Sequence, residues 1–266
     1  MKASPHGTYV YCVFASRRVP AVPRLTLRRL PGTGPVRLLE IRPGRFLVVG
    51  TAPLNRFGED VIPERLSDLD WVARAAVAHE AVVESFLGVD ALLPMRLLTI
   101  FTSDDRALHE VRENWPRIER DLRRLTQKVE WGIRLTLSDP PSTSGPVARR
   151  APRPGTAIPP QSGRDYLRAK SRLRGVAGAR LGAARRRTAS VYKALASRAT
   201  EAKRRPLAAS PSDGGRLLLD AAFLVPVSSS SRFHDHARRL TSSLRAEGLN
   251  LQMTGPWPAY SFVRDA

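Results

Sequence analysis

The chain has 266 residues, 42% of them hydrophobic, which is enough for one large or two modest domains with apolar cores. It contains no apolar run of about 18 residues, which argues against a membrane-spanning helix, and its N-terminus lacks the pattern of a signal peptide. The single cysteine, Cys12, has no partner for an internal disulfide, so a reducing cytosolic compartment is expected.

The net charge of +20 is concentrated in one segment. Residues 141–210 hold 17 basic and two acidic residues, a net charge of +15, whereas the parts before and after this segment are nearly balanced. Arginine outnumbers lysine by 39 to 5. We therefore interpret the charge as a solvated helix or one that faces an acidic partner, and nucleic acid is not the expected native partner.

The first 127 residues are expected to form an α+β domain. Thr8 to Phe14 alternates and is rich in β-branched and aromatic residues, which predicts a strand. Apolar runs at 36–41 and 46–51 flank the turn residues Arg42-Pro-Gly-Arg45, which predicts a β-hairpin.

A first long helix is expected to follow Ser67 as its N-cap and to end at Gly88. Residues 91–101 then predict a strand that Pro94 interrupts. The predicted apolar face of the helix comprises Leu69, Val72, Ala73, Ala76, Val83, Phe86 and Leu87.

A second helix is expected to begin after Ser103 as its N-cap. Pro116 lies inside this helix, and because the apolar stripe keeps its phase across the proline, we expect a kink and not two separate helices. The stripe follows alternating steps of three and four residues through Leu108, Val111, Trp115, Ile118, Leu122 and Leu125.

The second domain is expected to cover residues 128–266 and to open with a strand at Lys128 to Leu137. A proline-rich loop at 139–160 precedes a long basic helix at 163–204. Gly175, Gly178 and Gly182 predict a hinge or a frayed region in this helix, because each glycine costs about 1 kcal/mol relative to alanine. A flexible linker is expected at 205–215.

The remaining residues predict a buried strand at 216–225, a helix capped by Ser231, and a strand at 249–253. The helix is expected to turn Phe233, Ala237, Leu240 and Leu244 inward. Both halves therefore belong to the α+β class, with antiparallel sheets faced by helices, and ferredoxin-like packing is the economical arrangement for the C-terminal half.

Residues that could carry chemistry occur, but without a complete catalytic or metal-binding pattern. His79-Glu80 lacks the second histidine of a zinc-protease motif, because Val83 takes that position. His234-Asp-His236 lacks an evident third metal ligand, and Cys12 has the setting of a core residue. We therefore expect no catalytic residue, no bound metal and no cofactor.

The C-terminal sequence Thr254-Gly-Pro-Trp-Pro-Ala-Tyr-Ser-Phe262 predicts a rigid turn that fixes the directions of Trp257 and Tyr260. Two interpretations remain open. The favoured one is that these rings fill the gap between the final strand and the helices. The alternative is that they anchor a partner, since aromatic residues supply much of the energy of protein interfaces.

This C-terminal sequence, with Gly215 to Pro226 before it, resembles the gas vesicle protein F/L family. Four further blocks resemble the same family in the same order: Thr8 to Phe14, Leu69 to Val83, Leu92 to Phe101 and Lys128 to Arg134. The segments around Tyr166 and Tyr192 are similar to its long helical region, so the resemblance spans nearly the whole chain. Residues 141–161 and 174–215 depart from the family pattern, because they are almost free of acidic residues.

The resemblance implies a two-domain α+β fold whose C-terminal half is a modified ferredoxin fold. It also implies a non-enzymatic accessory protein of gas vesicle assembly, located at the gas vesicle or in the cytoplasm. Its expected partners are the major shell protein and other gas vesicle accessory proteins, with no membrane partner. The candidate partner-binding residues are Trp257, Tyr260, Arg185, Arg186 and Arg187. The alternative hypothesis is a regulatory or nucleic-acid-binding module that acts through the basic segment 149–205.

Overall fold

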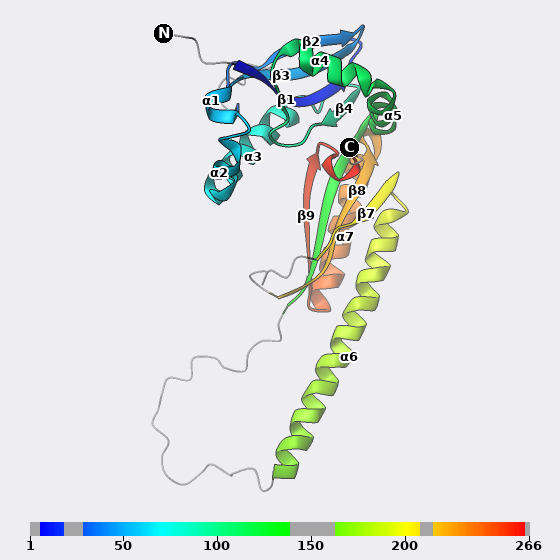
Figure 1. Cartoon of the computed structure of the whole chain (residues 1–266). Helices are drawn as coiled ribbons and strands as arrows, with labels where there is room; N and C mark the ends of the chain where they lie inside the picture. The colour runs from blue at the N-terminus through cyan, green and yellow to red at the C-terminus, as the bar shows by residue number, and fades with distance from the viewer. Residues whose placement is uncertain (1–5, 19–28, 139–162, 208–214, 264–266) are drawn as a thin grey trace. The chain divides into compact units, whose positions relative to one another are not determined.

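The computed structural model describes residues 6–18, 29–138, 163–207 and 215–263 (Figure 1). The proline-rich loop expected at 139–160 and most of the expected linker at 205–215 thus lie outside the described residues. The chain divides into two compact units at Trp131 and Gly132. The first unit also includes residues 224–230 and the C-terminal segment from Gly255. With the domain boundary expected between residues 127 and 128, both segments were predicted to belong to the second domain.

The first unit is built on a sheet with the strand order β2-β3-β1-β4, and β5 also pairs with β1. Strand β1 lies antiparallel to β3, β4 and β5, and β2 forms the predicted hairpin with β3. The single strand expected at 91–101 is wrong, because β4 ends at Pro94 and Leu98 adopts a positive φ of 65° before β5 begins. The bounds are β1 (His6–Ala15), β2 (Arg37–Arg42), β3 (Arg45–Pro53), β4 (Ala91–Pro94) and β5 (Ile100–Phe101).

Three helices follow β3 in the first unit: α1 (Leu54–Phe57), α2 (Ile62–Ser67) and α3 (Leu69–Glu84). Only α3 was predicted from the sequence, with its N-cap one residue too early. The carboxylate of Asp68, not the hydroxyl of Ser67, accepts a hydrogen bond from the Trp71 backbone N–H and thereby caps the first turn.

The buried face of α3 also differs from the predicted one. Val83 and the following Phe86 are buried as expected, but Leu69 is 79% exposed, and Ala73 and Ala76 are exposed as well. The helix has apolar residues on two sides, so periodicity alone could not decide which side meets the sheet. The buried residues within α3 are Ala75, His79, Val82 and Val83.

The next helical region consists of two helices, α4 (Asp104–Glu113) and α5 (Trp115–Leu125), separated by Asn114. The expected kinked single helix is therefore wrong. Pro116 occupies the first turn of α5, where its missing N–H leaves no intrahelical hydrogen bond unmade. The Ser103 cap is confirmed by its hydrogen bond from the Arg106 N–H. The predicted stripe is buried at Val111, Trp115, Ile118, Leu122 and Leu125.

A second sheet has the strand order β7-β8-β6-β9, and its elements follow one another as strand, helix, strand, strand, helix, strand. This combination is the ferredoxin-like topology, which confirms the predicted fold class. The strand ends at 128–131, 224–226 and 255–257 are part of the first unit. The bounds are β6 (Lys128–Leu137), α6 (Gly163–Ala196), β7 (Glu201–Arg204), β8 (Arg216–Pro226), α7 (Ser230–Ala246) and β9 (Leu249–Trp257), with short 3-10 turns η1 (Val227–Ser229) and η2 (Tyr260–Phe262).

The basic helix ends earlier than predicted, at Ala196, and residues 201–204 form the strand β7. Its Glu-Ala-Lys-Arg sequence has helical propensity, but pairing with β8 at the edge of the sheet overrides this local preference. The hinge expected at Gly175, Gly178 and Gly182 is also wrong, since α6 continues through all three residues.

Helices α6 and α7 cover the same face of the second sheet (Figure 1). The Phe223 ring on β8 lies 5.7 Å from the ring of Tyr192 on α6 and 5.6 Å from the ring of Phe233 on α7. Because successive side chains of a strand point to opposite faces, Asp220 lies on the face of the sheet away from these two helices. Among the described helices, none combines the length and the apolar character needed to cross a membrane.

Candidate interaction surfaces

Of the residues considered for catalysis or metal binding, His79 and Cys12 lie in the interior of the first unit, whereas His234 and His236 lie half-buried on α7 of the second unit. His79 is 3% exposed and Cys12 is fully buried, and burial raises the pKa of the Cys12 thiol. Within the described ranges, no group of three or more histidine, cysteine, aspartate and glutamate residues has a geometry suited to a metal ion.

A polar network fixes the tautomer of His79. Its Nε2 lies 3.2 Å from the carbonyl oxygen of Met95, which can only accept, so Nε2 carries the proton. Nδ1 then accepts a hydrogen bond from the Tyr9 hydroxyl at 2.7 Å, and the Tyr9 oxygen accepts from the Leu98 N–H at 3.2 Å. Burial lowers the pKa of His79 to about 4 and raises that of Tyr9, so both groups are neutral near pH 7. His79 therefore joins α3 to the sheet as a structural residue.

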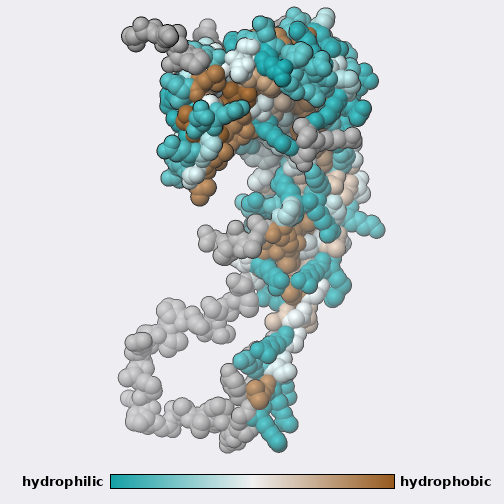
Figure 2. Space-filling view, viewed as in Figure 1, coloured by the Kyte–Doolittle hydropathy of each residue, from teal (hydrophilic) through white to brown (hydrophobic). Residues whose placement is uncertain are grey.

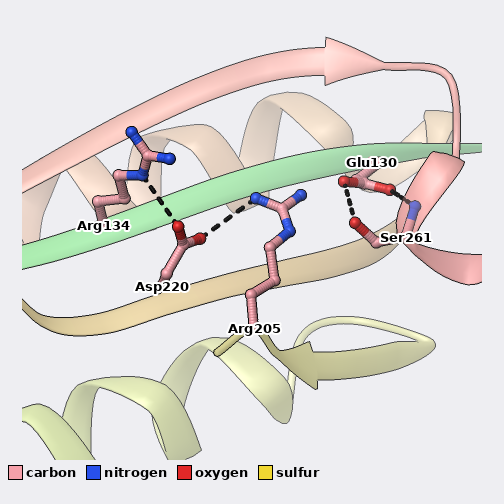
Figure 3. Close-up of polar contacts among 5 residues, drawn as sticks. All are labelled: Glu130, Arg134, Arg205, Asp220 and Ser261. Atoms are coloured by element: carbon pink, nitrogen blue, oxygen red, sulfur yellow. Dashed lines mark hydrogen bonds and ion pairs between the residues drawn. The ribbon is translucent and has the colours of Figure 1, made fainter. Parts of the chain in front are cut away.

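The C-terminal turn is packed onto the first unit. Gly255 has a φ of +120°, and a Cβ atom there would lie 2.8 Å from the Glu130 carbonyl oxygen, so a residue with a side chain would not fit. Trp257 ends β9 half-buried. The carboxylate of Glu130 accepts two hydrogen bonds of 2.8 Å from the backbone N–H and the hydroxyl of Ser261 (Figure 3).

Tyr260 lies against the core of the first unit, with its ring 6.5 Å from that of His79. Burial raises the pKa of its hydroxyl, which makes no hydrogen bond within the described part of the chain. Its ring is part of the packing around His79, and it is half-buried, as Trp257 is. Both rings are half-buried, so the structure does not separate the two predicted aromatic candidates by exposure.

The face of the second sheet away from α6 and α7 carries a three-membered ion network, which connects β6, β8 and the residue after β7. Asp220, 9% exposed at its side chain, accepts from Arg134 Nε at 3.0 Å and from Arg205 Nη1 at 3.2 Å (Figure 3). No aromatic side chain from residues 132–137 of β6, from β7, or from residues 249–254 of β9 is available on this face. Sheets that bind single-stranded RNA stack its bases on aromatic rings, and these strand segments offer no such ring on this face.

The three candidate arginines of α6 have different surroundings. Arg185 and Arg186 are exposed. Arg187 Nε forms an ion pair of 2.9 Å with Glu247, and its Nη2 donates to Ser243 Oγ at 3.1 Å, so Arg187 holds α6 to α7. The structure therefore leaves two of the three predicted arginines exposed to solvent.

Sequence reasoning missed an exposed apolar surface on α2 and α3. Hydrophobic surface, brown in Figure 2, lies over these two helices of the first unit. Leu69 and Val77 are 79% and 68% exposed, and Leu66 on α2 is 47% exposed. The signal was present in the sequence, because Leu69, Ala73, Ala76 and Val77 recur at helical spacing on the side opposite Ala75 and Val82.

Comparisons with known proteins agree over nearly the whole chain. The sequence pattern of the family described as gas vesicle synthesis protein GvpL/GvpF matches residues 7–264. The chain is similar to gas vesicle protein L of Streptomyces sp. (strain CB03234), with 33% identity over 236 residues, which cover 87% of this chain and 84% of that protein. It is also 28% identical to gas vesicle protein F of the same strain over 272 residues, which cover 97% and 99% of the two chains.

Two solved structures share the fold. The crystal structure of gas vesicle protein GvpF from Anabaena sp. PCC7120 matches with a TM-score of 0.61 and 15% identity, and covers 98% of this chain and 99% of that one. The GvpF structure from Microcystis aeruginosa matches with a TM-score of 0.60 and 16% identity, and covers 97% and 99%. At these identities the likeness extends to the fold and its mixed helices and antiparallel sheets.

Proposed function

The chain belongs to the gas vesicle synthesis protein GvpL/GvpF family, and we propose that it is a non-enzymatic accessory protein that binds the hydrophobic shell protein and aids its incorporation into the vesicle. The observation that carries this proposal is the extent of the match, which runs from residue 7 to residue 264 and so includes both units. The gas vesicle is then the structure with which the protein associates during assembly.

A physical reason supports shell-protein binding as the activity. A small subunit with a large apolar surface aggregates unless a partner covers that surface before assembly. The exposed apolar residues Leu66, Leu69 and Val77 give this chain a surface suited to such a contact. The groups that most resemble catalytic residues, His79 and Cys12, are buried and do not reach the surface.

Co-expression provides the direct test. The tagged chain is expressed with each gas vesicle protein in turn, and the amount of each protein that is captured is measured. We expect the shell protein to be captured. A chain that captures other accessory proteins but no shell protein would contradict the proposed activity while leaving family membership intact.

The exposed basic side chains of α6 support a second candidate, binding of an acidic partner or of nucleic acid. Arg164, Arg168, Lys170, Arg172 and Arg174 are all exposed in the first half of this helix. Fluorescence anisotropy with a DNA duplex between about 50 and 200 mM salt tests the nucleic-acid version, since phosphate contacts make affinity fall steeply with salt. Tight, salt-dependent DNA binding combined with no capture of shell protein would favour this second function.

A further inference from the structure

We propose that the outward side of α3 is the docking face for an amphipathic helix of the shell protein, and this inference rests on the proposed function. The docking face is defined by Leu69, Ala73, Ala76 and Val77, together with the groove beside them. It belongs entirely to the first unit.

Four of the six exposed residues of α3 are apolar, and the other two, Asp70 and Arg74, are charged. The opposite side of the same helix already meets the core through Ala75, His79 and Val82. A helix that covers a sheet needs only one apolar stripe for that purpose. Within the described residues, the second stripe therefore has no role in the packing of the first unit, and its exposure lowers solubility unless a partner covers it.

A groove lies along one side of this stripe. It has a volume of about 530 Å³, within the range of about 300–1,000 Å³ that is typical of ligand sites. Its lining is mostly small and apolar, which allows the backbone of an incoming segment to approach closely. The lining residues are Arg29, Pro31, Ala73, Arg74, Val77, Ala78 and Ala81.

The charges at the groove restrict the chemistry of the occupant. The two charged lining residues, Arg29 and Arg74, are both basic. The Nε of Arg29 donates to the Thr33 carbonyl oxygen at 2.8 Å, which holds this side chain in place, and Arg74 is exposed. An apolar segment that also carries a carboxylate complements this lining, whereas a basic segment would be repelled.

The length of the stripe favours a helix as the occupant. From Leu69 to Val77 the stripe spans about 12 Å, at about 1.5 Å per residue, and it ends at the acidic Glu80. Two helical turns of apolar surface match the spacing of i, i+3, i+4 and i+7 anchors on an amphipathic helix. Such an anchor pattern would place apolar side chains against Ala73 and Val77 and a carboxylate near Arg74.

The test uses the full chain co-expressed with tagged shell protein. Ala73→Glu and Val77→Glu each place a charge in the middle of the docking face, and Ala183→Glu makes the same kind of change at an exposed position of α6. We expect the first two variants to reduce capture by about ten-fold or more, as for a central interface position, and the control to bind as the unmodified chain does. Thermal melting temperatures of all three should match the unmodified chain, because the substituted side chains are exposed.

A second pair of variants tests the charge. Arg74→Glu should weaken capture of the shell protein. The loss should be smaller at high salt, because the ion pair between Arg74 and a carboxylate of the docked helix is exposed to solvent. Arg112→Glu on α4 is the control and should leave capture unchanged.

The possible results separate the docking face from the proposed function. If the unmodified chain captures no shell protein, the proposed function itself fails. If the unmodified chain and both α3 variants capture it equally, shell binding stands and the docking face is wrong. If the unmodified chain is a dimer and Val77→Glu makes it a monomer without affecting capture, the occupant is a second copy of the chain and the proposal is overturned.

Discussion

The stability of the first unit should fall in acid because of His79. Burial holds the pKa of this imidazole at about 4, against about 6.5 in the unfolded chain. Above pH 6.5 the residue is neutral in both states and costs nothing. As the pH falls from 6.5 toward 4, the unfolded chain takes up a proton that the folded chain does not, so the free energy of unfolding decreases.

The size of the loss follows from the two pKa values. One pKa unit corresponds to about 1.4 kcal/mol, so lowering the pH from 7.5 to 4.5 should remove about 2.5 kcal/mol through His79 alone. His79→Gln has no ionisable ring and retains an amide that can both donate to the Met95 carbonyl and accept from the Tyr9 hydroxyl. This variant should therefore lose about 2.5 kcal/mol less than the unmodified chain over the same pH interval.

Urea unfolding followed by tryptophan fluorescence provides the measurement. All four tryptophans, Trp71, Trp115, Trp131 and Trp257, belong to the first unit, so the signal reports that unit. His109→Gln on the exposed side of α4 serves as the matched control and should follow the pH profile of the unmodified chain. Parallel profiles for His79→Gln and the unmodified chain would refute the reasoning, since they would mean that burial does not keep His79 neutral.

Three further substitutions test packing and ion pairs. Asp220→Ala should lower the free energy of unfolding of the second unit by about 1–2 kcal/mol. The loss is smaller than for a fully buried ion pair, because Arg134 and Arg205 both reach solvent and can be rehydrated. A change below about 0.5 kcal/mol in chemical unfolding would contradict this. Arg187→Glu should lower the free energy of unfolding by about 1 kcal/mol, because the new carboxylate is repelled by Glu247. Arg186→Glu, at an exposed position, should change it by less than about 0.5 kcal/mol. Equal melting temperatures for the two variants would show that the ion pair between Arg187 and Glu247 contributes nothing to stability. Trp257→Ala should lower the free energy of unfolding by about 2 kcal/mol, which is below the range for a fully buried tryptophan because this ring is half-buried. Unchanged stability combined with lost capture of shell protein would instead identify Trp257 as a partner anchor.

Elements with a strong local signal could be predicted from the sequence. The alternation of Thr8 to Phe14 and the turn chemistry at Pro43-Gly44 led to the first strand and the hairpin, and the Ser103 cap set the start of α4. The fold class of the ferredoxin-like half could also be predicted, because its helices and its longer strands show the hydrophobic periodicity typical of each element. These signals act within about ten residues, which is the range over which side-chain periodicity and capping operate.

Features that depend on residues distant in sequence could not be predicted from local patterns. Residues 201–204 became a strand because β8 offers an edge for pairing, although their composition favours a helix. The C-terminal turn joined the first unit through the hydrogen bonds of Ser261 to Glu130, two residues 131 positions apart.

Helix α3 shows most directly the difference between what local sequence patterns indicate and what contacts with distant residues decide. Hydrophobic periodicity alone indicates that this segment is a helix with apolar residues on two sides. Only packing against the sheet, where Tyr9 bonds His79, decided that Ala75 and Val82 are buried and that Leu69 and Val77 remain at the surface. Hydrophobic burial depends on which surfaces meet, and a helical repeat contains no information about the surface that a neighbouring element presents to it.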